Sequence, residues 1–113
     1  MQFAIRTVNL YKYLVENRKE YVLSKQLLRS GTSIGANIRE AQQAESDKDF
    51  IHKLSIALKE STETEYWLEL LFQTEYLKEN EYTSIIKDCQ KLKLMLVKIT
   101  KNKKKNTGLQ VYD

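Results

Sequence analysis

The sequence predicts an all-α fold, an antiparallel up-down-up-down four-helix bundle. Three observations support this class: the 113 residues contain no proline and only three glycines, apolar residues recur at intervals of three and four, and the breaks between periodic segments are short. Connections of about four residues make consecutive helices antiparallel neighbours. We expect one bundle domain over residues 1–102 and a basic, flexible tail over residues 103–113. The expected helices cover residues 2–17, 21–44, 46–76 and 80–101.

The first two expected helices each carry one apolar stripe. In the first, the stripe is Ala4, Ile5, Val8, Tyr11, Leu14 and Val15. In the second, it is Leu23, Leu27, Ile34, Ile38 and Ala41. Such spacing places the apolar side chains on one side of a helix, so we expect each helix to bury one face against its neighbours.

The third expected helix begins at Ser46, because Ser46 followed by Asp49 is similar to a capping box. Asn80 is the expected cap of the fourth helix. The third helix has a spine that steps by four and three, which is typical of bundle cores: Phe50, Leu54, Ala57, Ser61, Thr64, Leu68 and Leu71. The fourth has the stripe Tyr82, Ile85, Cys89, Leu92, Leu96 and Ile99.

Gly31, Gly35 and a row of small polar residues interrupt the second helix, and each interior glycine costs about 1 kcal/mol relative to alanine. Four polar residues lie together on one side of this helix: Arg29, Ser33, Asn37 and Glu40. They form either a recognition site or a structural polar network at a tight helix crossing. We favour the structural network, because the two glycines alongside permit close approach of another helix.

The third expected helix has a second apolar face, nearly opposite its spine. The residues on this face are Ile56, Tyr66, Trp67 and Leu70. A helix that is apolar on two opposed faces is normally buried on both, and Trp and Tyr are enriched at protein interfaces. We therefore expect this face to form the interface of a homo-oligomer.

Charge is distributed unevenly along the chain, although the net charge is only +4. Residues 1–39 hold seven basic and two acidic residues, residues 40–81 hold four and eleven, and residues 82–113 hold eight and two. Two basic blocks around an acidic one indicate either a polyanion-binding surface or self-association of unlike faces. A solvated charged surface is the ordinary alternative.

Lysines dominate the last segment of the chain. Lys91, Lys98 and Lys105 repeat every seven residues, so a helix would present them to phosphates as a basic ridge. The alternative is a solubilising helix with a lysine-rich tail. The candidate nucleic-acid-binding residues are Arg18, Lys19 and Lys25 near the first connection, and Lys87, Lys91, Lys98, Lys101, Lys103, Lys104 and Lys105.

The sequence offers little for catalysis, metal binding or cofactor binding. His52 is the only histidine and Cys89 the only cysteine, and there is no glycine-rich phosphate loop or Gly-x-Ser-x-Gly turn. We expect a non-enzymatic protein without metal or cofactor, and we interpret Cys89 as a core residue. No apolar run approaches the roughly 20 residues that cross a bilayer, and no secretory signal is evident, so we expect a cytoplasmic protein without membrane contact.

The strings VLSKQLLRSGTSIGANIREAQQAES and DFIHKLSIALKESTETEYWLELL resemble a family of bacterial four-helix-bundle proteins encoded in intervening sequences of large-subunit (23S) ribosomal RNA genes. The same family includes the accessory variability protein of diversity-generating retroelements. The resemblance extends from Phe3 to Leu96. Family members often have alanine or proline where this chain has Gly31 and Gly35. The most specific residues are Gln26, Arg29, Ser33, Ile34, Asn37, Ile38 and Glu40, followed by Ser61, Glu65 and Leu68.

The resemblance implies an antiparallel four-helix bundle that assembles into a ring-like homopentamer. For the retroelement members it also implies a basic surface that binds nucleic acid and a partner reverse transcriptase. We therefore expect a homopentameric nucleic-acid-binding protein, with RNA ahead of DNA as the ligand. The alternative is a ring-forming protein-interaction module that docks a protein such as a reverse transcriptase.

Overall fold

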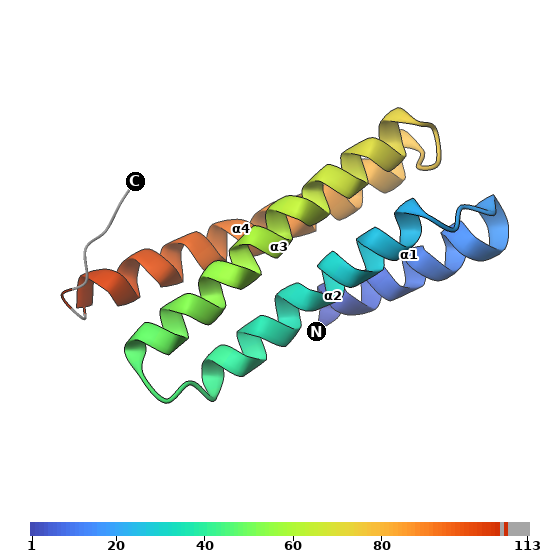
Figure 1. Ribbon diagram of the computed structural model, residues 1–113. Coiled ribbons are helices and arrows are strands. Elements are labelled where there is room, and N and C mark those ends of the chain that lie inside the picture. Colours follow the sequence, from blue (N-terminus) through green and yellow to red (C-terminus); the bar gives the residue numbers. More distant parts are fainter. Residues whose placement is uncertain (107, 109–113) are drawn as a thin grey trace.

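The structure is a computed structural model, and it describes residues 1–106 and Gly108. Four helices make up almost all of this part of the chain, and the residues described include no β-strand. The predicted all-α class with four helices is therefore confirmed. The helices are α1 (Gln2–Arg18), α2 (Leu23–Gln42), α3 (Asp47–Gln73) and α4 (Glu79–Asn106) (Figure 1).

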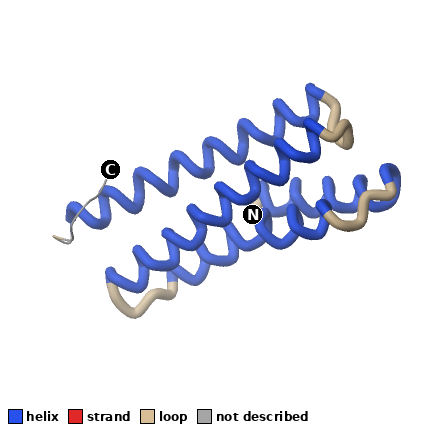
Figure 2. Tube along the Cα trace, turned by 45° about the horizontal axis from the view of Figure 1, so that its top comes forward, coloured by secondary structure: helices blue, strands red, loops and turns tan. Residues whose placement is uncertain are grey.

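The helices pack side by side, and each runs antiparallel to the next along the chain (Figure 1, Figure 2). The most extensive packing is between α2 and α3, followed by α3 with α4 and α1 with α2, whereas α1 touches α4 only slightly. The molecule is elongated, with dimensions of 49 × 24 × 20 Å. The α1–α2 and α3–α4 turns lie at one end, and the α2–α3 turn and the end of α4 lie at the other (Figure 1).

The predicted spine of α3 lies at the centre of the core. All of its members are buried except Phe50, which is half-buried. Between α2 and α3, the hydroxyl of Thr64 donates to the hydroxyl of Ser30 at 2.9 Å, so the polar groups inside this contact are satisfied. Cys89 is fully buried as predicted, and burial raises the pKa of its thiol to about 12.

The start of α2 is fixed by Glu20, which the sequence assigned to a connection. The Glu20 carboxylate accepts hydrogen bonds from the backbone N–H groups of Val22, Leu23 and Ser24, at 2.6 to 3.0 Å. The first N–H groups of a helix have no partner within the helix, and here one buried carboxylate serves three of them. As a result α2 begins at Leu23, two residues later than expected.

The caps of α3 and α4 give one confirmation and one correction. The hydroxyl of Ser46 accepts a hydrogen bond from the Asp49 N–H at 3.1 Å, which confirms the predicted start of α3. The prediction that Asn80 caps α4 is wrong, because α4 begins at Glu79. Instead, the carboxylate of Glu81 accepts from the Lys78 N–H at 2.8 Å, so the capping side chain reaches back from the first turn.

The last helix is longer than predicted. It runs to Asn106, so residues 103–106, expected in the tail, are helical. Lys103 stabilises this extension, because its ammonium group lies 3.0 Å from an Asp47 carboxylate oxygen and 5.4 Å from the centre of the Phe50 ring. Basic residues in the last turn also favour a helix through its dipole. The rest of the expected tail, apart from Gly108, lies outside the described residues.

Contact with Gly31 decides which face α1 buries. A Cβ atom on Gly31 would lie 2.5 Å from Cγ2 of Thr7, so only glycine admits the fully buried Thr7 side chain at this crossing. The Thr7 hydroxyl donates to the Phe3 carbonyl at 2.9 Å, which satisfies it inside the contact. The predicted stripe of α1 is therefore partly wrong: Leu14 is buried, but Ile5 is 52% exposed.

The bundle has four helices along only part of its length, because α1 begins midway along α2 (Figure 1). Beyond that point one side of α4 has no helix over it. Ile99, predicted as a core residue, is 38% exposed here. Thr100 is buried instead, and its hydroxyl donates to the Leu96 carbonyl at 2.7 Å.

Candidate nucleic-acid interface

A row of exposed lysines runs along the outer side of α4, opposite the buried residues Ile85, Cys89 and Leu96. The steps between these lysines are four, seven and seven residues, which keeps them on one side of a helix. At 1.5 Å per residue the row is about 27 Å long, enough to follow about eight phosphates of one strand. We call this row the lysine stripe; its members are Lys87, Lys91, Lys98 and Lys105.

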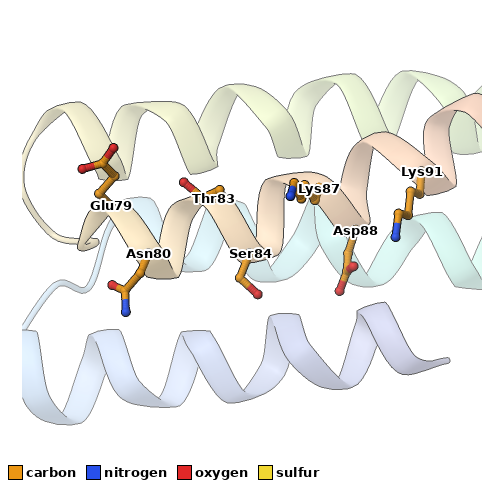
Figure 3. Close-up of a pocket in the computed structure, with 7 residues that line it drawn as sticks. All are labelled: Glu79, Asn80, Thr83, Ser84, Lys87, Asp88 and Lys91. Carbon is orange, nitrogen blue, oxygen red and sulfur yellow. The ribbon is translucent and has the colours of Figure 1, made fainter.

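The first half of the stripe borders an open hollow of about 820 Å³ on α4, and Lys87 and Lys91 line it. Figure 3 shows Asn80, Ser84 and Asp88 of this hollow on the side of α4 that faces α1. Asp88 is the acidic residue closest in sequence to the two lysines, and it pairs with Arg6 of α1 at 2.5 Å. Asp88 is therefore paired, and Glu79, at the start of α4, is the other carboxylate that lines the hollow with Lys87 and Lys91.

The predicted site residues between Lys98 and Lys105 differ from one another in exposure. Lys101 is exposed and Lys104 is half-buried near the end of α4. Lys103 pairs with Asp47, as described above, and so contributes to packing. Near the end of α4, the predicted phosphate contacts Lys98 and Lys105 are therefore exposed, whereas Lys103 is held by Asp47.

The predicted basic residues of the first connection lie at the opposite end of the molecule from Lys105. The Arg18 guanidinium donates to the Tyr76 carbonyl at 2.8 Å and the Glu75 carbonyl at 2.9 Å, and it lies 5.4 Å from the centre of the Tyr76 ring. Arg18 thus ties the α1–α2 turn to the α3–α4 turn. Lys19 and Lys25 are exposed. The first connection therefore lies at the end of the molecule where α4 begins, and Lys105 lies at the other end (Figure 1).

The predicted polar row of α2 is used mainly within the protein. Arg29 pairs with Glu60 at 3.2 Å and with Glu63, both on α3. Ser33 donates to the Arg29 carbonyl at 2.6 Å, and Asn37 donates to the Ser33 carbonyl at 2.9 Å. This arrangement matches the structural interpretation of these three residues. Glu40 is exposed and joins no ion pair among the residues described.

The predicted oligomer face of α3 is mixed in character. Tyr66 is 57% exposed, whereas Ile56, Trp67 and Leu70 are half-buried. Trp67 packs against the apolar core, and its indole N–H donates to Glu63 at 3.0 Å; this bond is the main reason that the pKa of Glu63 is lowered. Trp67 therefore stabilises the single chain, and Tyr66 is the residue of this face that remains most available to a second copy.

One feature that sequence reasoning missed is a groove between α2 and α4, in line with the start of α1. Its volume is about 510 Å³. Gly35, which the sequence placed at a helix crossing, lines this groove and has no atom within 4 Å of where a Cβ would lie. The unequal lengths of the expected helices could have predicted this groove, because a first helix of about 16 residues cannot cover a fourth helix of 22 or more.

The described residues give no sign of a metal site or a membrane span. Within residues 1–106 and Gly108, no group of three or more His, Cys, Asp or Glu side chains is arranged to hold a metal ion. No helix in the same part of the chain is both long and apolar enough to cross a bilayer.

Fold and site together define a class: a small all-α protein of four helices with a lysine stripe on the outer side of its last helix. A family model described as 23S rRNA-intervening sequence protein matches residues 1–98. The chain therefore belongs to this family, as the sequence resemblance predicted.

A solved structure supports the same assignment. It is the 1.70 Å crystal structure of a protein with unknown function from the S23 ribosomal protein family of Bacteroides thetaiotaomicron VPI-5482. The two chains are 62% identical, the TM-score is 0.88, and the match covers 88% of this chain and 93% of the other. A comparison with curated proteins gives no match.

Proposed function

We propose that this protein is a non-enzymatic, homopentameric nucleic-acid-binding protein, with RNA ahead of DNA as its ligand. The observation that carries the proposal is the lysine stripe, whose four side chains are exposed on one side of α4. Lysines on one face attract phosphates without reading bases, so the expected binding is tight at low salt and weakly dependent on sequence. The order of RNA before DNA rests on the family resemblance, and the same measurement with a single-stranded DNA tests it.

The pentamer in this proposal rests on the family resemblance and on the exposed Tyr66 side chain of α3. Repetition of the stripe around a ring would also multiply the phosphate contacts of one copy, which raises the affinity for a long strand without any new contact. This gives the ring a role in binding.

The proposal is tested by measuring the affinity for a single-stranded RNA at several salt concentrations. Replacing all four stripe lysines with glutamine should reduce the log–log salt slope by about 3 per copy bound, because each lost phosphate contact removes about 0.7 from it. A matched control replaces four exposed lysines outside the stripe: Lys12, Lys48, Lys59 and Lys78. This control changes the net charge equally and should alter the slope far less. Equal effects of the two variants, or no RNA binding at low salt, would refute the proposal.

A second candidate function is a ring-forming protein-interaction module or accessory subunit, for example one that docks a reverse transcriptase. The observation that favours it is the exposure of Ile5 (52%) and Leu94 (63%), since exposed apolar side chains are a feature of protein interfaces. A partner protein that is retained after nuclease treatment and after neutralisation of the stripe would support this candidate over nucleic-acid binding.

A further inference from the structure

The groove beside the start of α1 is a helix-sized gap in the bundle. At this level α2 and α4 continue past the start of α1, and both Figure 1 and Figure 2 place the N-terminus midway along the molecule. The gap exposes Met95 by 44% and Ile99 by 38%. We call it the Gly35 groove; the lining residues that matter below are Ile34, Gly35, Ile38, Lys91, Leu92 and Met95.

No contact among residues 1–106 and Gly108 requires position 35 to lack a Cβ. Gly35 lies in the interior of α2, where glycine costs about 1 kcal/mol relative to alanine, and a Cβ on it would meet nothing. Gly31, one turn earlier, shows what such a glycine does when it is covered, because there Thr7 fills the space that a Cβ would take. The missing Cβ of Gly35 would admit a side chain from outside in the same way.

The charges beside the groove indicate what kind of surface fits it. Lys91 lines the groove, Arg39 directly follows the lining residue Ile38, and both basic residues are exposed. Asp88 also lines the groove, but it is paired with Arg6. Two copies packed groove to groove would therefore bring basic residues together, which is unfavourable. An apolar ridge beside acidic residues fits better.

This chain carries such a ridge on the outer side of α3. Tyr66, Glu69, Leu70 and Gln73 surround a hollow of about 220 Å³, and they follow each other at the spacing of one helix face. Tyr66 and Glu69 are exposed, and Leu70 is half-buried. Glu69 is the charged member of this face, and its charge is opposite to that of Lys91 in the groove. We call these four residues the Tyr66 patch.

We propose that the Tyr66 patch of one copy docks in the Gly35 groove of the next copy. The inference rests on the proposed ring and deepens it, because it names the two surfaces that meet. Packing a side-chain ridge of one helix into the groove between two others is a common mode of helix contact. Since the two surfaces differ, the interface is head-to-tail, and repeating it closes a ring or extends a filament. Lys91 is then shared between the groove and the lysine stripe, while the other stripe lysines stay outside the contact.

Two variants test the docking, one on each surface. Gly35→Leu fills the groove, and Tyr66→Lys places a basic residue in the patch. Each variant alone should be a monomer of about 13.3 kDa by sedimentation equilibrium. A mixture of the two should form one-to-one dimers and nothing larger, because one variant keeps its patch and the other keeps its groove. Recovery of dimers on mixing distinguishes a head-to-tail interface from a symmetric one, in which both partners would need the same intact surface.

Control variants show that the effects come from the two surfaces. Ala36→Leu adds the same side chain at the next, exposed position of α2, and His52→Lys adds a basic residue about four turns away on α3. Both should keep the wild-type mass. Circular dichroism and urea unfolding should show that all four variants remain folded, because each substituted position is exposed or, at Gly35, faces open space.

Several outcomes would overturn the docking. If Gly35→Leu keeps the wild-type mass, the groove is not the interface, although the wild-type oligomer still supports a ring. If the mixture remains monomeric, the two surfaces do not meet. If the wild type is itself a monomer, both the ring and the docking fail, and RNA binding by the stripe is still decided separately by its salt dependence.

Discussion

At the scale of single residues, the two glycines of α2 differ in whether the fold has room for a side chain at their position. Gly31 is required by Thr7, whereas a Cβ on Gly35 would meet no side chain among the residues described. We expect Gly31→Ala to lower the free energy of unfolding, because overpacking of about 1–3 kcal/mol outweighs the roughly 1 kcal/mol gained in helix propensity. We expect Gly35→Ala to raise the free energy of unfolding by up to about 1 kcal/mol. Urea unfolding, with both changes made in the Tyr66→Lys background to avoid effects of association, measures the difference.

A second change at the same contact separates the steric cause from any other. Thr7→Ala removes the two atoms that a Cβ on Gly31 would approach most closely, at 2.5 and 2.8 Å. Combined with Gly31→Ala, it should recover most of the lost stability. If the double variant is as unstable as the sum of the single ones, close packing against Thr7 is not the reason for glycine at position 31.

At the scale of the helices, the start of α2 depends on one buried carboxylate. Burial by itself would raise the pKa of Glu20, but hydrogen bonds from the backbone N–H groups of Leu23, Ser24 and Val22 outweigh burial and lower it. The ionised carboxylate therefore stabilises the folded state. Its contribution is fully present above the pKa of an unfolded glutamate and disappears as the pH falls through the lower, folded pKa. We expect Glu20→Gln to lower the free energy of unfolding by about 1–2 kcal/mol at pH 7.

The pH dependence distinguishes this cap from ordinary packing. The difference in unfolding free energy between wild type and Glu20→Gln should shrink as the pH is lowered from 7 to about 3. Glu16→Gln, a matched change at an exposed position of α1, should have little effect at any pH. A loss of stability in Glu20→Gln that stays constant across this range would show that the carboxylate charge is not what holds α2.

Helix periodicity predicted the existence and order of the helices, the spine of α3 and the Ser46 cap, because these depend on residues close in sequence. It did not predict the buried face of α1, which is chosen by the contact between Thr7 and Gly31. It also ended α4 too early, since the pairing of Lys103 with Asp47 joins residues far apart in the chain. Features that arise only from contacts between distant segments could not be predicted from the spacing of residues along one helix.

At the scale of the whole molecule, the lysine stripe lies on the outer side of α4, whereas two other lysines of this helix, Lys93 and Lys103, pair with Glu65 and Asp47 of α3. The stripe was predictable, because its spacing alone places Lys91, Lys98 and Lys105 on one helix face. The position of Arg18 beside the α3–α4 turn was not, because it follows from how the four helices are arranged. The sequence also did not predict that Arg18 joins two turns, because its hydrogen-bond acceptors are backbone carbonyls of a distant segment.

If the outer side of α4 binds phosphates, bound RNA should shield its lysines from chemical modification, which a lysine-reactivity footprint measures. The full chain is acetylated with and without a single-stranded RNA of about 20 nucleotides at low salt, and modification at each lysine is measured by mass spectrometry. We predict that RNA protects Lys87, Lys98 and Lys105, the stripe lysines outside the docking contact, and leaves Lys12, Lys48, Lys59 and Lys78 reactive. Equal protection of both sets, or protection of the second set alone, would contradict the account.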